Sequence, residues 1–262
     1  MSSENDYVLT RDYLENSRLN LFHYQWVELF GYHTHPKIPI NGPKLRIADV
    51  GTGTGVWLTD LAARLPSSVQ LDGLDISFRS MPPKDWLPSN VALRQWDIKG
   101  DVPDELVCAY DVVHLRNFVF VLKDGEMKQA VANVKKIIKP GGFLQWGETD
   151  IHGWRVEKAN PGNKIDAHKQ LMQLTLGQDT RLQSTWIPTL AQLCSEAGFT
   201  DVETDCQLIL HELIPRRNRN DSVGQEVKRL LPEVHNETVA GACFAMTRYM
   251  VVGRKPGAPE EA

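Results

Sequence analysis

The amino-acid sequence predicts an α/β fold, in which a doubly wound, mostly parallel sheet of seven strands carries helices on both faces. Two observations lead to this prediction. Short apolar segments alternate with amphipathic segments along much of the chain, as they do in successive strand–helix units. Residues 49–55, with the sequence DVGTGTG, stand where the first apolar segment passes into an amphipathic one. Such a run is typical of a glycine turn between a strand and a helix.

The predicted elements follow in chain order. Apolar residues at steps of three and four predict a first helix over residues 11–30. Leu58, Leu61, Ala62 and Leu65 predict a second helix directly after the glycine turn. Met127 to Ile138 form a third, which Pro140 and Gly141 end. A fourth helix covers 187–197, and Gly198 closes it. The expected strands are Lys44–Asp49, Val69–Leu74, Val91–Trp96, Tyr110–Leu115, Phe143–Glu148, Val202–Leu210 and Cys243–Val252, the last two as an antiparallel pair.

The same pattern divides the chain into parts. Residues 1–40 are expected to form an N-terminal helical cap, and residues 41–254 the main domain. Residues 151–185 are polar and lack a strand-like run, so they form either an inserted lid over an acceptor pocket or a surface excursion without a role. The Gly/Pro/Glu-rich residues 255–262 are expected to be a disordered tail.

Composition narrows the class of protein. The chain has 262 residues, of which 42% are hydrophobic and 24% charged, values that suit a globular protein. The formal net charge is −4 and no basic stripe is present, so nucleic acid is not an expected partner. No apolar run approaches the length of a membrane span, and the four cysteines lack metal-ligand spacing. We therefore expect a cytoplasmic protein without a membrane partner; its N-terminal helix and an exposed sheet edge are the surfaces that a homodimer would use.

The glycine turn indicates an adenosine-containing cofactor. A turn of this kind lets a ligand approach the backbone and directs free helix N–H groups toward it. Asp75 ends the next apolar strand, where a carboxylate can accept hydrogen bonds from both ribose hydroxyls. A dinucleotide fingerprint would need a third small residue at Val56, and Asp49 suits a cationic ligand better than a pyrophosphate. These residues favour S-adenosylmethionine (SAM) over NAD.

Three further segments match one family in order. They are Trp96-Asp97-Ile98, the strand 110–116 with the sequence YDVVHLR, and the turn 139–144 with the sequence KPGGFL. With the glycine turn, they make residues 40–150 resemble a class I SAM-dependent methyltransferase. Tyr7-Val8-Leu9 and residues 17–20 resemble the fungal secondary-metabolism branch of that family. The resemblance implies a Rossmann-like methyltransferase fold and methyl transfer to a small-molecule acceptor, expected to be a secondary metabolite.

The resemblance also implies which residues bind SAM. Asp49 and the turn would hold its methionine part, Asp75 its ribose and Asp97 its adenine amino group. Arg18 is either a snorkelling residue at the edge of the first helix or a partner of the cofactor carboxylate. The expected cofactor-binding residues are Arg18, Asp49, Gly51, Thr52, Gly53, Gly55, Asp75, Ile76, Asp97, Ile98, Leu115 and Arg116.

The sequence does not decide which residue, if any, acts as the catalytic base. Glu148 and His152 stand at or just after the fifth strand, where an acceptor should lie, but a mechanism that only positions the acceptor needs neither. His33 and His35 have no acid or cysteine close by, so they are interpreted as an exposed linker, and no metal is expected.

Three other functions are considered. An NAD-dependent reductase lacks support in the motifs. A regulatory protein of secondary metabolism would keep this fold and act through protein partners, and a SAM-binding protein could catalyse a different reaction.

Overall fold

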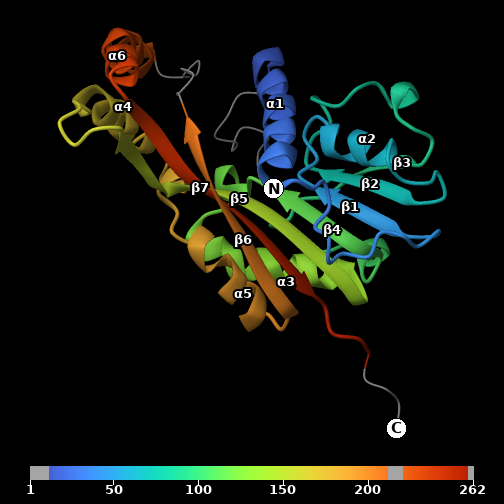
Figure 1. Ribbon diagram of the computed structural model, residues 1–262. Helices are drawn as coiled ribbons and strands as arrows, with labels where there is room; N and C mark the ends of the chain where they lie inside the picture. The colour runs from blue at the N-terminus through green and yellow to red at the C-terminus, as the bar shows by residue number, and fades with distance from the viewer. Residues whose placement is uncertain (1–11, 212–220, 259–262) are drawn as a thin grey trace.

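The central element is a single sheet whose strand order is β3-β2-β1-β4-β5-β7-β6 (Figure 1). The computed structural model describes residues 12–211 and 221–258. Only β7 runs antiparallel to its neighbours, which confirms the doubly wound, mostly parallel α/β fold. The strands are β1 (Arg46–Val50), β2 (Gln70–Asp75), β3 (Val91–Gln95), β4 (Tyr110–Arg116), β5 (Ile138–Lys158), β6 (Thr200–His211) and β7 (Ala242–Arg254).

Helices cover both faces of this sheet, as Figure 1 shows. One face carries α1 and α2, the other α3 and α5, and α4 and α6 lie together near the end of the long strands β5 and β7. The helices are α1 (Tyr13–Phe30), α2 (Val56–Ala62), α3 (Met127–Ile137), α4 (Asp166–Leu176), α5 (Leu190–Glu196) and α6 (Asp221–Val239). Short 3₁₀ turns, among them Phe118–Phe120, join several of these elements.

The first helix is defined at both ends by local chemistry. The Asp12 carboxylate accepts hydrogen bonds from the backbone N–H groups of Leu14 and Glu15, each at 3.0 Å, and so caps the N-terminus. Gly31, at φ 77°, ends the helix in the left-handed region. These caps fix a helix of 18 residues across the carboxyl end of the sheet.

The alternation of side chains along the strands separates two buried layers. Val112 on β4 packs with Trp57, Leu58 and Leu61 of α2. Val113 and Leu115, the intervening residues of the same strand, pack on the opposite face with α3 and α5. The sheet is therefore apolar on both faces, and polar side chains gather at its strand ends.

The insertion after the fifth strand differs from the prediction. β5 continues to Lys158, so residues 151–158 are strand, paired with β7 beyond an irregularity between Asp150 and Arg155. Ile151 and Trp154 are buried, whereas His152 is exposed, and this polar outer face hid the strand from the sequence pattern.

The helix α6 was also not predicted. It packs with α4 and β7 around Trp154, Leu171, Leu230 and Phe244, which form a small third core. Of the predicted tail, residues 255–258 contain no helix or strand, and the remainder lies outside the described residues. Within the described ranges no helix is both long and apolar enough to cross a membrane.

Candidate cofactor and active site

The glycine turn joins β1 to α2 and is held against β2. Gly51 and Gly53 adopt left-handed φ values of 68° and 57°, which favour glycine. The N–H of Gly51 donates to the backbone carbonyl of Leu74 at 2.7 Å, and the N–H of Gly53 donates to Asp75 Oδ2 at 3.0 Å. The turn therefore folds toward the acid that ends the neighbouring strand.

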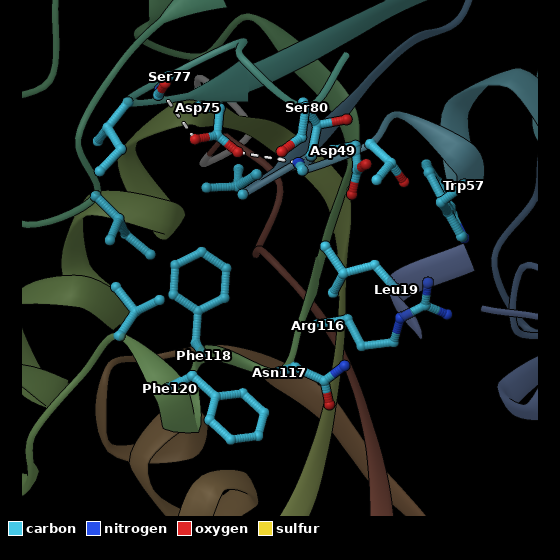
Figure 2. Close-up of a pocket in the computed structure, with 18 of the residues that line it drawn as sticks. Leu19, Asp49, Trp57, Asp75, Ser77, Ser80, Arg116, Asn117, Phe118 and Phe120 are labelled. Atoms are coloured by element: carbon cyan, nitrogen blue, oxygen red, sulfur yellow. Dashed lines mark hydrogen bonds between the residues drawn. The ribbon is translucent and has the colours of Figure 1, made fainter. Parts of the chain in front are cut away.

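A cavity of about 180 Å³ lies beside this turn, at the carboxyl ends of β1, β2 and β4 and next to α1 (Figure 2). This is the place where open α/β sheets bind their ligands. The structure brings ten of the predicted cofactor residues to its wall: Arg18, Asp49, Gly51, Thr52, Gly53, Asp75, Ile76, Asp97, Ile98 and Arg116.

Two predicted residues do not line the cavity. Leu115 is fully buried on the opposite face of β4, because successive strand residues point to opposite sides, so its expected place beside the methyl group is wrong. Gly55 caps the N-terminus of α2 at φ 72° instead. Both residues shape the site only through the backbone that they share with their neighbours.

Several lining residues were missed by the sequence interpretation. Asn16, Leu19 and Phe22 of α1 line the cavity at steps of three, a helix-face spacing that could have identified them. Phe118 and Phe120 follow directly after β4, and Figure 2 shows both rings at the side of the cavity away from Asp75. Their position in a turn after a strand left no periodic signal.

The Asp75 carboxylate lines the cavity and accepts hydrogen bonds from the backbone around it. Its Oδ2 accepts from the N–H of Gly53 and its Oδ1 from the N–H of Ser77, at 3.0 and 3.1 Å. Each carboxylate oxygen has a second lone pair, so the same group can also accept from ligand hydroxyls. Asp97 lies at the end of the next strand over and also lines the cavity.

Asp49 is anchored by a buried histidine. His114 Nδ1 lies 2.7 Å from Asp49 Oδ1, and the imidazole stacks on Trp57 with ring centroids 4.0 Å apart. Burial lowers the pKa of His114 to about 4, against the opposing effect of the Asp49 hydrogen bond. The neutral ring therefore donates its Nδ1–H to the Asp49 carboxylate, which keeps that acid oriented at the cavity wall.

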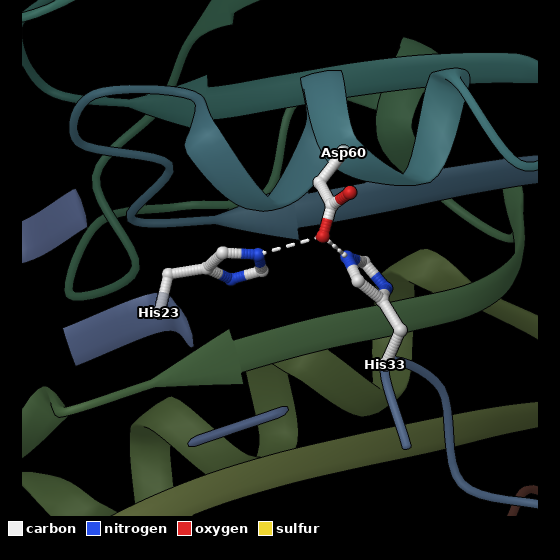
Figure 3. A group of neighbouring side chains, drawn as sticks. All are labelled: His23, His33 and Asp60. Atoms are coloured by element: carbon white, nitrogen blue, oxygen red, sulfur yellow. Dashed lines mark hydrogen bonds and ion pairs between the residues drawn. The ribbon is translucent and has the colours of Figure 1, made fainter. Parts of the chain in front are cut away.

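Three side chains behind this pair form the group shown in Figure 3. Asp60 Oδ2 lies 2.9 Å from His23 Nε2 and 3.4 Å from His33 Nε2. His33 also stacks on Trp57, so the prediction of an exposed linker is wrong for His33, and His35 is buried too. The segment packs inward because its rings fill the space between α1, α2 and the sheet.

The hydrogen bonds of this group argue against a metal ion. A guanidinium only donates hydrogen bonds, and Arg116 Nη2 lies 3.2 Å from His23 Nδ1. His23 Nδ1 must then accept, which places the ring proton on Nε2, the atom that faces Asp60. A metal ion bound at His23 Nε2 would need the opposite tautomer, with Nδ1 protonated. The group is therefore a hydrogen-bonded link between α1, α2 and Arg116.

The two residues considered as catalytic base have other positions. Glu148 is fully buried, and its carboxyl oxygens accept hydrogen bonds from the backbone N–H groups of Phe118 and Val119 and from Trp146 Nε1. It thus holds the turn after β4 and does not line the cavity. His152 is exposed on the outer face of β5 and is not part of the wall either. The structure gives neither residue a place beside a reacting group.

Glu148 predicts a pH dependence of stability. Burial, opposed by the three hydrogen bonds, raises its pKa from 4.5 to about 8. The folded protein then keeps a proton that the unfolded chain releases, so stability is full below pH 4.5 and falls as pH rises toward 8. We expect a slope of up to about 1.4 kcal/mol per pH unit in urea unfolding, which Glu148→Gln should lack. Equal slopes in the two proteins would contradict this role.

Comparison with known proteins shows which proteins this chain resembles. Residues 48–144 match the family model of a methyltransferase domain. The methyltransferase grgD of Penicillium sp is 41% identical over 117 residues, which cover 42% of this chain and 40% of that protein. The N-methyltransferase tcpN of Claviceps purpurea is 29% identical over 211 residues, covering 76% of this chain and 71% of that protein. The secondary metabolism regulator laeA of Fusarium oxysporum f. sp. lycopersici is 28% identical over 204 residues, covering 76% and 62%.

Solved structures share the fold. A chain from the complex between the Haloferax volcanii Trm112 methyltransferase activator and a methyltransferase superposes with a TM-score of 0.56 at 16% identity, covering 94% of this chain and 96% of that one. Phosphoethanolamine N-methyltransferase 2 of Haemonchus contortus, with S-adenosylhomocysteine (SAH) bound, gives 0.51 at 15% identity, covering 91% and 53%. Residues 48–144 therefore resemble a methyltransferase domain, and the chain as a whole is similar to class I SAM-dependent methyltransferases, those of fungal secondary metabolism among them.

Proposed function

We propose that this protein transfers a methyl group from SAM to a nitrogen atom of a small-molecule acceptor in fungal secondary metabolism. The cavity beside the glycine turn is the observation that carries the proposal, because it gathers the turn, Asp75 and Asp97 at neighbouring strand ends. The nitrogen acceptor is supported by tcpN, verN and gliN, three relatives named as N-methyltransferases.

The residues present fit an adenosyl group. A side chain at Gly51 would place its Cβ 2.8 Å from the Phe118 ring, so the bare backbone lets the ring pack on the turn, and the two together form one wall of the cavity. Asp75 has lone pairs for ribose hydroxyls, and Ile76 and Ile98 supply apolar wall for an adenine ring. Asp49 presents a carboxylate that suits a ligand ammonium group. Bound SAM would supply an electrophilic methyl group on its sulfonium.

The chain's own contribution is then positioning and exclusion of water. Holding two reactants in line can contribute several kcal/mol toward the barrier. Phe118 and Phe120 present apolar faces to the cavity, and Arg116 and Asn117 provide donors beside them. An amine that binds in its neutral form needs no protein base, which agrees with the positions of Glu148 and His152 away from the wall.

The proposal is tested by incubating the protein with methyl-labelled SAM and a panel of small amines and their hydroxyl counterparts. We expect label on amines and the matching release of SAH. Label only on hydroxyl compounds would exclude nitrogen as the acceptor. A protein that binds SAH but methylates nothing, and that captures a stable protein partner, would instead support a regulatory role, which the similarity to laeA favours as the second candidate.

A further inference from the structure

Two arginine side chains, the buried Arg248 and the half-buried Arg116, lie next to α1 without an acidic partner. Arg248, on β7, is 1% exposed, and Arg116 stands at the end of β4. No described carboxylate forms an ion pair with either guanidinium. The charge of Asp49 reaches Arg116, but the Asp49 hydrogen bond goes to His114. An unpaired charge inside a protein is costly, so an arginine kept there needs a reason.

Aromatic rings pack on the guanidinium group of Arg248, but most N–H groups at its edge have no hydrogen-bond acceptor. The Trp26 and Phe22 rings lie over the guanidinium, with centroids 5.0 and 5.5 Å from its carbon. A ring face offers no acceptor to N–H groups that point outward in the guanidinium plane. Nε and Nη1 have no hydrogen-bond partner, and Nη2 has only the Gln25 amide oxygen at 3.5 Å. These donors are suited to a planar acceptor that forms two parallel hydrogen bonds.

The side chain of Phe22 lies between Arg248 and the proposed SAM cavity. Phe22 lines that cavity and also covers Arg248, so rotation of a single ring would expose the guanidinium to it. Arg116 already lines the cavity. The Arg116 and Arg248 guanidinium carbons lie 5.7 and 5.0 Å from the centroid of the same Trp26 ring, so the two side chains are neighbours. Burial lowers the pKa of both arginines to about 10.

The local charge sets the kind of ligand. The charge of Asp49 reaches Arg116, whereas no described carboxylate is paired with Arg248, so the Arg248 guanidinium keeps an unbalanced positive charge. A monoanion would balance it. The acids Asp75 and Asp97 also line the cavity, and Figure 2 shows Asp75 and Arg116 on opposite sides of it. An anionic group would therefore lie away from the acid-lined side, near the arginines.

We propose that Arg248, together with Arg116, binds a carboxylate of the methyl acceptor, so that the acceptor is a carboxylate-bearing small molecule. This inference rests on the proposed function, because it takes the cavity as the place where the acceptor meets SAM. The alternative ligand for these two arginines is the carboxylate of SAM itself. The affinity of an Arg248 variant for SAH distinguishes the two, because SAH carries the same carboxylate as SAM and no acceptor is present.

Thermal unfolding with simple probes tests the proposal. Benzoate is the carboxylate probe and benzamide its neutral counterpart, each with and without SAH. We expect benzoate at about ten times its Kd to raise the Tm of the natural protein by about 2–5 °C, and benzamide to have no such effect. Arg248→Met should lose the benzoate response, whereas Arg229→Met, on the exposed face of α6, should keep it.

The ligand-free variant and its affinity for SAH separate the competing roles. Methionine removes an unpaired buried charge and keeps much of the volume, so the Tm of Arg248→Met should equal or exceed that of the natural protein. A clearly lower Tm would make Arg248 a packing residue and overturn the proposal. So would an unchanged benzoate response in the variant, no response in the natural protein, or a tenfold loss of SAH affinity in the variant. Failure of the proposed function is distinct, because the natural protein would then not bind SAH while its benzoate response persisted.

Discussion

Gly51→Ala is expected to weaken SAH binding at least about tenfold and to lower the free energy of unfolding by about 1–3 kcal/mol. Gly51 has a φ of 68°, a left-handed conformation that alanine adopts only with strain. The added Cβ would also lie 2.8 and 2.9 Å from two atoms of the Phe118 ring. The turn or the ring must then shift, and both form the cavity wall. Calorimetric titration with SAH and urea unfolding measure the two effects.

The chain offers a matched control for this variant. Gly125 has no atom within 4 Å of the position of an added Cβ and is not at positive φ, so Gly125→Ala should leave both measurements unchanged. The double variant Gly51→Ala/Phe118→Ala should lose less stability than the sum of the two single losses, because the steric conflict disappears while the backbone strain and the loss of the buried Phe118 ring remain. Normal SAH affinity in Gly51→Ala would show that the turn does not approach the ligand.

Asp75→Ala is expected to raise the Kd for SAH by about tenfold to a hundredfold, equivalent to about 1–3 kcal/mol. The Asp75 carboxylate both accepts from the backbone of the glycine turn and offers lone pairs to ribose hydroxyls. Removing it leaves the hydroxyls of a bound ligand without their acceptor. Calorimetry on the variant, after a thermal melt confirms that it is folded, gives the change in affinity.

A ligand analogue makes this experiment specific to the ribose. SAH without its ribose hydroxyls should bind weakly to the natural protein and lose little more in Asp75→Ala, since the interaction is already absent. Asp85→Ala removes an exposed acid and serves as the control. Equal losses for SAH and the analogue would assign Asp75 to the turn alone and remove the ribose role.

The sequence interpretation succeeded where one local signal fixed both structure and position. The motif 49–55, Asp75 and Asp97 each follow an apolar strand, and parallel strands bring their carboxyl ends to one edge. The register between β1, β2 and β3 places these residues around one cavity.

Other parts of the site depend on contacts that no local pattern contains. Leu115 was misplaced by one position, because period-two alternation sends it away from the cavity that Arg116 lines. Glu148 was expected at the end of the fifth strand, but β5 continues past it, and its carboxyl group is taken up by two backbone N–H groups and Trp146. Arg248 comes from the last strand and meets α1 only in the folded chain. Long-range packing decides such roles, and spacing along the chain does not report it.

Calorimetric titration of the natural protein with SAM, SAH and NADH tests the central claim most directly, which is that the cavity beside the glycine turn binds an adenosyl cofactor of methyl transfer. The account predicts micromolar binding of SAM and SAH with one site per chain, and no heat from NADH. Binding of NADH in preference to SAM, or absence of binding by all three ligands, would contradict it.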